Sequence, residues 1–317
     1  MEWSFKNEKA WEIIFNPNAL GHRRIDVEDT LRSQLAKLSV VFHFQHAHSA
    51  ASCRDLLRKY CEAGKRHFMI VGGDGTLNES INGIVESGVN TQEVFVVVIP
   101  VGTGNDWSRT HHYPTAIIDD IAQLQQGRFT PHDIGVVETL SGNEIIAKRH
   151  FINIAGFGFD AAVIETVSQQ KSTLFPSLVY LLGLLKTLFN YRSLPLTVSS
   201  SELTVTDRFF SIAVGICQYN GNGMRQVPSA SPQDGLFDVV LIRHLSKLKV
   251  IRNVQKLFSG KHIHLKEVTQ FQTTQLTLHS TEKLLGEVEG ELLLPGKFRI
   301  KQLPHPIQIL TFNANLE

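Results

Sequence analysis

The distribution of apolar residues divides the chain into two parts with different periodicities. In the first part, short and almost continuous apolar runs alternate with segments in which apolar residues recur every three or four positions. Unbroken runs are typical of parallel strands buried on both faces, and the wider spacing is typical of helices. The predicted strands cover residues 11–15, 40–44, 68–71 and 94–100, and the predicted helices cover residues 26–38, 49–63 and 77–85. This alternation predicts an open, parallel α/β sheet.

Strands dominate the second part, from about residue 132 onward. Alternating patterns and short turns, such as Ser141-Gly142-Asn143, indicate antiparallel pairing. The predicted strands cover residues 134–138, 151–155, 196–198, 203–205, 210–216, 236–242, 275–278 and 298–300, and the predicted helices cover residues 174–189 and 246–259. We therefore expect an α/β domain at 8–130 and a β-rich domain at 131–304. A last strand at 307–312 makes the segment 305–317 a candidate to return to the first domain.

The composition is that of an ordinary globular protein. The chain has 317 residues, 42% of them apolar and 19% charged, a length that accommodates two domains. Its net charge of +1 gives no indication of nucleic-acid binding. The three cysteines form no C-x-x-C pair, which argues against zinc or thioredoxin-type chemistry and is typical of a reducing cytoplasm. The N-terminus lacks a signal-peptide core, and the longest apolar run, 178–185, is far shorter than the about 20 residues of a membrane span. We expect a cytoplasmic protein, either soluble or peripheral on the inner face of the membrane.

A glycine-rich string, Gly72-Gly73-Asp74-Gly75-Thr76-Leu77-Asn78-Glu79, follows one buried strand and opens a helix. Glycines let the backbone approach a ligand closely, and the N–H groups at a helix start attract phosphate. Asp74 would repel phosphate unless a metal ion or water lies between them, so we interpret it as a residue on the metal side of the site. The alternative is a tight strand-to-helix turn, which the length of the string makes less favoured.

A second string, Pro100-Val101-Gly102-Thr103-Gly104-Asn105-Asp106-Trp107, follows the next buried strand. Ligands of open α/β sheets bind outside the carboxyl ends of the strands, so the two strings are expected to face one site. The second string does not complete G-x-G-x-x-G, and the pattern G-x-x-x-x-G-K-[ST] is absent from the chain. A Rossmann dehydrogenase and a P-loop enzyme are therefore disfavoured.

Together with Asn16-Pro17 after the first strand, these strings closely resemble the diacylglycerol kinase catalytic domain family. This family includes bacterial lipid kinases and sphingosine kinases, and it is related to NAD kinases and phosphofructokinases. The resemblance continues in family order through four further strings: Asp133-Ile134-Gly135, Asn153-Ile154-Ala155-Gly156-Phe157-Gly158, Asp234-Gly235-Leu236-Phe237-Asp238 and Glu289-Gly290-Glu291. It implies an NAD-kinase- or phosphofructokinase-like α/β domain and a mainly antiparallel β domain.

The resemblance also implies ATP and Mg²⁺ as cofactors. The residues expected to bind the nucleotide are Asn16, Pro17, Gly72, Gly73, Asp74, Gly75, Thr76, Asn78, Glu79, Gly102, Thr103, Asn105 and Asp106. Asp74, Asp106 and Asp133 would form an Asp–water–Mg²⁺ network, and Asp234 resembles a structural metal site of some bacterial members. The phosphate-contacting threonine of the family has no assignable counterpart here.

A carboxylate must accept the proton of the alcohol as the bond to phosphorus forms. The family pattern is Asp-Gly-Glu, whereas this chain has Glu289-Gly290-Glu291. We expect Glu291 to be the proton acceptor with Glu289 beside it; an exposed acidic turn is the alternative. The expected reaction is ATP-dependent phosphorylation of a lipid, with diacylglycerol giving phosphatidate. NAD kinase, or a catalytically impaired regulator that binds nucleotide or lipid, remains the alternative.

Two segments suggest contact with a membrane. The predicted helix at 174–189 is apolar nearly all round, and residues 243–266 contain seven Lys or Arg but no Asp or Glu. A basic face of this kind attracts anionic lipids. The alternatives are a buried helix at 174–189 and a solvated helix face at 243–266. We expect a lipid substrate at the membrane surface and no nucleic acid, and a homodimer is compatible with the sequence. His111-His112 is interpreted as a solvated loop pair.

Overall fold

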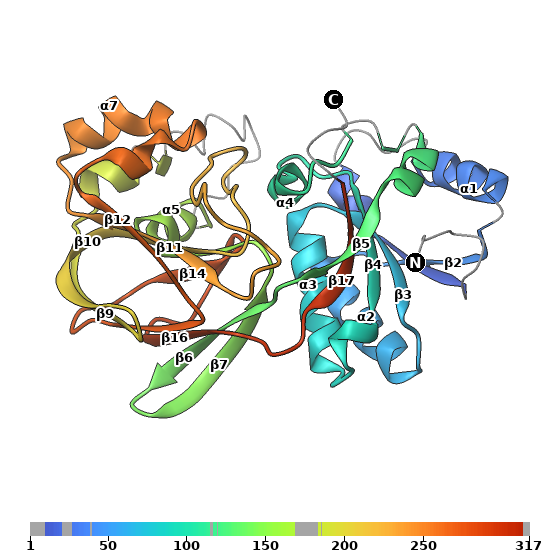
Figure 1. Ribbon diagram of the computed structural model, residues 1–317, viewed down its shortest axis with the longest axis horizontal. Coiled ribbons are helices and arrows are strands. Elements are labelled where there is room, and N and C mark those ends of the chain that lie inside the picture. Colours follow the sequence, from blue (N-terminus) through green and yellow to red (C-terminus); the bar gives the residue numbers. More distant parts are fainter. Residues whose placement is uncertain are drawn as a thin grey trace. The chain divides into compact units, whose positions relative to one another are not determined.

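The computed structural model describes residues 10–20, 27–38, 40–114, 117–118, 120–168, 183–184 and 186–312, which fall into two units (Figure 1). The first unit contains residues up to 134, Gly221–Gly223, and residues from 303 onward. The second contains Gly135–Asn220 and Met224–Gln302. Each unit is built around its own sheet.

The first unit has a six-stranded sheet in the order β2-β1-β3-β4-β17-β5. Its strands are β1 (Trp11–Phe15), β2 (Phe42–His46), β3 (His67–Gly72), β4 (Phe95–Pro100), β5 (Arg128–His132) and β17 (Ile307–Thr311). All neighbours pair in parallel except β5, which runs antiparallel to β17. The three central strands β1, β3 and β4 are almost wholly buried, which explains why they could be predicted from unbroken apolar runs.

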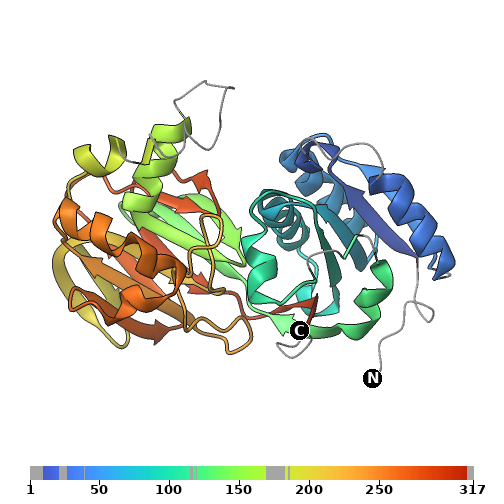
Figure 2. The same ribbon diagram turned by 90° about the horizontal axis from the view of Figure 1, so that it is seen from above.

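Helices cover both faces of this sheet. They are α1 (Val27–Lys37), α2 (Ala50–Glu62), α3 (Asp74–Glu86) and α4 (Asp106–Thr110), with 3-10 turns η2 (Pro17–Leu20), η3 (Thr91–Glu93) and η4 (Ile121–Gln126). Because β1–β2 and β2–β3 cross over in opposite directions, right-handed connections place α1 on one face and α2 and α3 on the other, as Figure 2 shows. Ser49 and Ser52 form a capping box that starts α2.

The second unit is a largely antiparallel sheet in the order β15-β14-β8-β10-β9-β13-β16-β6-β7, with β11 paired to β10 and β12. Its strands are β6 (Gly135–Ser141), β7 (Glu144–Phe151), β8 (Ile154–Gly158), β9 (Leu194–Ser200), β10 (Thr204–Gly215), β11 (Phe237–Arg243), β12 (Val268–Thr273), β13 (Gln275–His279), β14 (Gly286–Val288), β15 (Glu291–Leu292) and β16 (Lys297–Gln302). Its helices are α5 (Phe159–Ser168), α7 (Lys247–Phe258) and the 3-10 turn η5 (Lys261–His264). The expected fold class, an α/β domain followed by a mainly antiparallel β domain, is confirmed.

Two strand predictions of the second unit are wrong in detail. The single strand predicted at 151–155 is the junction of β7 and β8, where the amides of Ile152 and Asn153 donate to the Glu289 side chain instead of to a neighbouring strand. The two strands predicted at 203–205 and 210–216 form one continuous strand, β10. The polar residues between the two predicted strands lie on the exposed N-terminal half of β10. The break in the apolar pattern was therefore caused by solvent exposure of the strand and not by a turn.

The predicted apolar helix at 174–189 lies mostly outside the described residues; of its end, Leu188 is buried and Phe189 is exposed. Across the described parts of the chain, no helix combines the length and the hydropathy needed to cross a bilayer.

Candidate active site

Three loops of the first unit leave the same edge of its sheet. Asn16, Gly73 and Val101 each follow the carboxyl end of one of the parallel neighbours β1, β3 and β4. The amide of Asn16 donates to the carbonyl of Val71, and that of Val101 donates to the carbonyl of Gly72, both at 3.0 Å. The loops therefore begin as continuations of the sheet, at the edge where open α/β sheets bind ligands.

Asn16 holds the first loop against the start of α3. Its Nδ2 donates to the Thr76 hydroxyl at 2.8 Å, and its Oδ1 accepts the backbone amide of Asn18 at 3.1 Å. Thr76 lies directly against Gly72, where an added Cβ would come within 2.5 Å of the threonine side chain. The first turn of α3 can therefore fold back over the end of β3 only because residue 72 is glycine.

The two glycine-rich loops touch through their backbones. A Cβ on Gly102 would lie 2.6 Å from the Cα of Gly73, a distance that real Cβ atoms essentially never show. Gly73 also stands at the N-cap of α3 and offers that helix no side-chain cap. A helix start bordered by glycine in this way is suited to receive phosphate oxygens on its backbone N–H groups.

The side chain of Asp74 also links the first glycine-rich loop to the second. Its carboxylate accepts the backbone amides of Asp106 at 3.1 Å and of Trp107 at 3.2 Å, which are the first residues of α4. Burial raises the pKa of Asp74, the amide hydrogen bonds oppose this shift, and the charge of nearby Asp106 adds to it. Asp74 is therefore a structural cap of α4 as well as a candidate metal-side residue.

The buried carboxylate of Asp106 accepts two further amides, from Asn222 and Gly223, both at 2.7 Å. Arg109 forms an ion pair with the same carboxylate, its Nε lying 3.4 Å from Asp106 Oδ1. A Cβ on Gly104 would lie 3.2 Å from Asp74 Oδ2 and 3.9 Å from Asp106 Oδ2, so both carboxylates border this glycine. Carboxylate oxygens are the ligands that Mg²⁺ prefers, and a cation here would offset both the burial of the Asp74 charge and its repulsion by Asp106, so these residues fit the ion.

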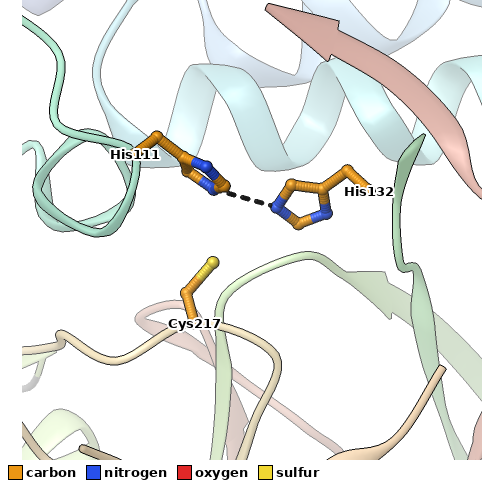
Figure 3. Close-up of side chains that lie close together, drawn as sticks. All are labelled: His111, His132 and Cys217. Atoms are coloured by element: carbon orange, nitrogen blue, oxygen red, sulfur yellow. Dashed lines mark hydrogen bonds between the residues drawn. The ribbon is translucent and has the colours of Figure 1, made fainter. Parts of the chain in front are cut away.

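Behind this loop lies a buried pair of histidines, His111 and His132 (Figure 3). His132 Nδ1 donates to the carbonyl of Asp133 at 2.8 Å, so its Nε2 is the acceptor for the indole N–H of Trp107 and for His111 Nε2, both at 3.1 Å. Burial lowers the pKa of His132 to about 4 and that of His111 well below its usual value, so both rings are neutral. The solvated loop predicted for His111 is wrong, because its ring packs on Trp107 of the preceding helix α4 and shares a hydrogen bond with His132, which lies on the distant strand β5.

Glu289 of the second unit forms a tight turn with Gly290. The two residues have φ of 51° and 90°, and glutamate adopts such a left-handed conformation rarely. Its Oε1 accepts the amides of Ile152 and Asn153, both at 2.8 Å, which fixes the carboxylate against the β7–β8 junction. Glu291 follows on β15 with an exposed side chain.

Glu287 is the buried member of the acidic cluster formed by residues 287–291, and the sequence motifs assign it no role. Its Oε2 accepts the amide of Gly290 at 2.7 Å, and among the described residues its Oε1 has no hydrogen-bond partner. Burial raises the pKa of Glu287 to about 8, with contributions from the charges of Asp160 and Glu289. Strand alternation could not have identified Glu287 as buried, because all three residues of β14 are buried.

Two family models cover most of the chain. Residues 10–137 match the diacylglycerol kinase catalytic domain, and residues 153–311 match the YegS C-terminal NAD kinase beta sandwich-like domain. The chain belongs to the diacylglycerol kinase catalytic domain family. The resemblance carried by the sequence motifs is thereby confirmed.

Curated relatives of this diacylglycerol kinase family member include two Bacillus subtilis (strain 168) proteins. One, YtlR, is named as a candidate lipid kinase and is 26% identical over 95% of this chain and 99% of its own. The other is named diacylglycerol kinase and is 26% identical over 92% of this chain and 93% of its own.

Solved structures show the same fold at lower identity. A candidate diacylglycerol kinase from Bacillus anthracis str. Sterne is 17% identical with a TM-score of 0.73, over 97% of this chain and 98% of its own. Yeast NADH kinase, solved with NADH, is 10% identical with a TM-score of 0.52, over 98% of this chain and 85% of its own.

The remaining residues predicted to contact nucleotide in this kinase family member are spread more widely. Thr103 is exposed in the second loop, and Asn105, with φ of 50°, donates to the carbonyl of Gly102 at 2.8 Å. Asn78 and Glu79 lie within α3, where Glu79 forms an ion pair of 3.5 Å with Arg54 of α2. Both belong to the packing of α3.

The three other predicted residues are found in loops and turns. Pro17 begins η2 beside a hollow of about 510 Å³, which His46 and His48 also line. Asp133 follows β5, and its backbone carbonyl accepts the hydrogen bond from His132 Nδ1. Asp234 is exposed, and its carboxylate accepts the amide of Leu236 at 3.0 Å in a turn that contains Gly235 at φ 73°. Such a hydrogen bond is what an Asp-Gly turn makes, so a metal at Asp234 stays a prediction.

Proposed function

We propose that this kinase family member transfers the γ-phosphoryl group of ATP to the hydroxyl of a lipid, with diacylglycerol as acceptor and phosphatidate as product. The observation that carries the proposal is the backbone contact of Gly73 with Gly102, beside the carboxylates of Asp74 and Asp106. It combines an open helix start, which suits phosphate oxygens, with two carboxylates, which suit a divalent cation.

The donor side of the reaction depends on positioning. The N–H groups of the glycine loops and the first turn of α3 would hold the phosphates, while Asn16 keeps that turn in place through Thr76. Asp74 and Asp106, with Asp133 as the third predicted ligand, would hold Mg²⁺, which supplies charge stabilisation to the transferring phosphoryl group.

On the acceptor side, the lipid oxygen attacks the γ-phosphorus, the bond between that phosphorus and the bridging oxygen breaks, and ADP leaves. The hydroxyl proton passes to a carboxylate, and we assign this role to Glu291, whose side chain is exposed. Glu289 is held by the two amides of Ile152 and Asn153 and would position the turn that carries Glu291.

A kinase assay with labelled ATP tests this proposal. Purified protein is incubated with Mg²⁺ and detergent micelles of diacylglycerol, ceramide, sphingosine or a polyprenol, and with NAD in a parallel reaction. We expect label in phosphatidate. Label in NADP and in none of the lipids would replace the proposal by an NAD kinase, and label in a different lipid would keep the reaction class and change the acceptor.

A further inference from the structure

Helix α7 of the second unit carries an apolar stripe that no other described residue covers. Leu248, Ile251, Val254 and Phe258 are exposed by 57%, 43%, 39% and 52%, and no residue of this helix is fully buried. At 100° per residue the four side chains fall within an arc of about 120°. Large apolar side chains scattered singly are normal on a protein surface, but a continuous stripe along one helix marks a contact surface.

Basic side chains border this stripe. Arg252 and Lys256 are exposed on the neighbouring arc of α7, and Lys247 stands at its first turn. Lys249 lies on the side of α7 away from the apolar stripe and forms an ion pair of 2.6 Å with Glu267. The absence of Asp and Glu from residues 243–266 leaves the uncovered surface of this helix strongly positive. The combination is that of a helix that lies in the interface of an anionic bilayer.

A cationic hollow continues the surface at the N-terminal end of α7. It has a volume of about 440 Å³, and its lining, as far as the structure describes the chain, includes Arg192, Arg208, His244 and Lys247 but no carboxylate. Arg208 Nη2 donates to the Ser193 carbonyl at 2.6 Å, and His244 shares a hydrogen bond of 3.0 Å with the Ser193 hydroxyl, so two of the basic side chains are held in the wall by hydrogen bonds.

The same hollow is joined to α7 by Lys247, which lines it beside an exposed aromatic ring. Phe189, 56% exposed, lines it, and Lys247 Nζ lies 5.8 Å from the centroid of that ring. Cations and exposed apolar side chains therefore form one continuous surface, which we call the α7 surface. It consists of Phe189, Arg192, Arg208, His244 and the exposed side chains of α7.

We propose that the α7 surface docks the protein on an anionic phospholipid bilayer. The apolar stripe would enter the level of the lipid headgroups and upper acyl chains, and the cationic hollow would receive lipid phosphates. Charge complementarity selects this occupant, because a cationic rim with no carboxylate matches a surface made of phosphates. The inference deepens the proposed function, since a lipid acceptor lies in a membrane, but docking requires neither nucleotide nor turnover.

Sedimentation with lipid vesicles in the absence of nucleotide tests the docking. We expect the protein to bind vesicles of phosphatidylcholine mixed with phosphatidylglycerol, to bind pure phosphatidylcholine poorly, and to be released by salt. Each basic residue near such a surface contributes about a fivefold change in binding, so R252Q/K256Q should weaken it about 25-fold. I251S/F258S should weaken binding in low and high salt alike, because it removes apolar contact rather than charge.

Matched controls lie on β7 of the same unit. Ile146, 46% exposed, and Lys148 are far from α7 in sequence and lie on another element, so I146S/K148Q should bind like the wild-type protein. Failure of the wild-type protein to bind anionic vesicles overturns the proposal. Equal vesicle binding by the α7 variants and the control also overturns it. The same holds if the α7 variants sediment with vesicles like the wild-type protein but no longer bind a protein partner. Thermal melts establish that all variants are folded.

The outcomes separate the two proposals. A protein that binds anionic vesicles but phosphorylates no lipid in micelles contradicts the proposed reaction alone. A protein that phosphorylates lipid in micelles but does not bind anionic vesicles contradicts the docking alone.

Discussion

Glu287 accepts the backbone amide of Gly290 at 2.7 Å, so a buried carboxyl holds the turn that links Glu289 to Glu291. The hydrogen bond joins Glu287 on β14 to Gly290, the residue that precedes β15. The shape of the predicted acceptor region therefore depends on a group that does not itself reach the surface.

Replacing Glu287 by glutamine should change the pH dependence of stability. Burial raises the pKa of Glu287 from 4.5 to about 8, so between these values the folded protein keeps a proton that the unfolded chain has released. The free energy of unfolding must then fall as pH rises through this range, by at most about 1.4 kcal/mol per pH unit for one group. We expect E287Q to be more stable than wild type at pH 8, with the difference shrinking toward pH 5. Urea unfolding at several pH values measures this, and E282Q, at an exposed position, should leave the wild-type slope unchanged.

Glu291 is the predicted proton acceptor. E291Q keeps the size of the side chain and removes its basicity, so turnover should fall by roughly 10²–10⁴-fold while ATP binding is retained. Steady-state kinetics with diacylglycerol micelles, beside nucleotide binding by calorimetry, separate the two effects. Wild-type turnover in E291Q would show that the base is another carboxylate.

Glu289 offers a related test, because the family pattern has aspartate at this position. E289D shortens the side chain that accepts the amides of Ile152 and Asn153, so we expect lower turnover and a less stable turn. If the wild-type protein binds ATP without turning over any acceptor, and E289D restores turnover, the chain is instead a catalytically impaired regulator.

Two glycines of α3 should respond in opposite ways to alanine. A Cβ at Gly83 would lie 2.2 Å from the backbone oxygen of Arg54, where α2 packs against α3, whereas a Cβ at Gly75 meets nothing within 4 Å. We expect G83A to destabilise the protein by about 1–3 kcal/mol, and G75A to stabilise it by about 0.5–1 kcal/mol. Denaturant unfolding compares them. Equal stability of the two variants would contradict the close packing of α2 on α3.

The contact of the two glycine loops should be equally sensitive. G102A places a Cβ 2.6 Å from the Cα of Gly73, which is a backbone atom and cannot move away without separating the loops. We expect ATP affinity to fall more than tenfold, measured by calorimetry. T103A, an exposed change in the same loop, should leave the fold intact and serves as a control for stability. Unchanged ATP affinity in G102A would place the nucleotide elsewhere.

Removal of divalent cations should abolish phosphoryl transfer if Asp74 and Asp106 hold Mg²⁺. D74N keeps only one of the two oxygens that accept the amides of Asp106 and Trp107, and it loses the charge, so it should require a higher Mg²⁺ concentration for half-maximal activity. A titration of activity against Mg²⁺ after treatment with a chelator measures this. Full activity of the wild-type protein in excess chelator would remove the metal from the proposal.

Much of the fold was determined by local sequence. The buried strands β1, β3 and β4 are unbroken apolar runs, and α7 has a clear helical period, so period and length identified them without tertiary information. Gly72, Gly73 and Gly102 stand where strands end, and the parallel order of those strands predicted that their loops would face one another.

Only the tertiary structure decided the states of individual polar groups. Nothing local distinguishes Glu287, buried with a raised pKa, from the exposed Glu291, because the difference comes from the strands packed around β14. His111 is buried because Trp107 and His132 surround it, and the junction of β7 and β8 follows from the carboxylate of Glu289, which is more than 130 residues away in sequence. Periodicity reports which side of an element faces the core, whereas hydrogen-bond partners and desolvation depend on contacts between distant segments.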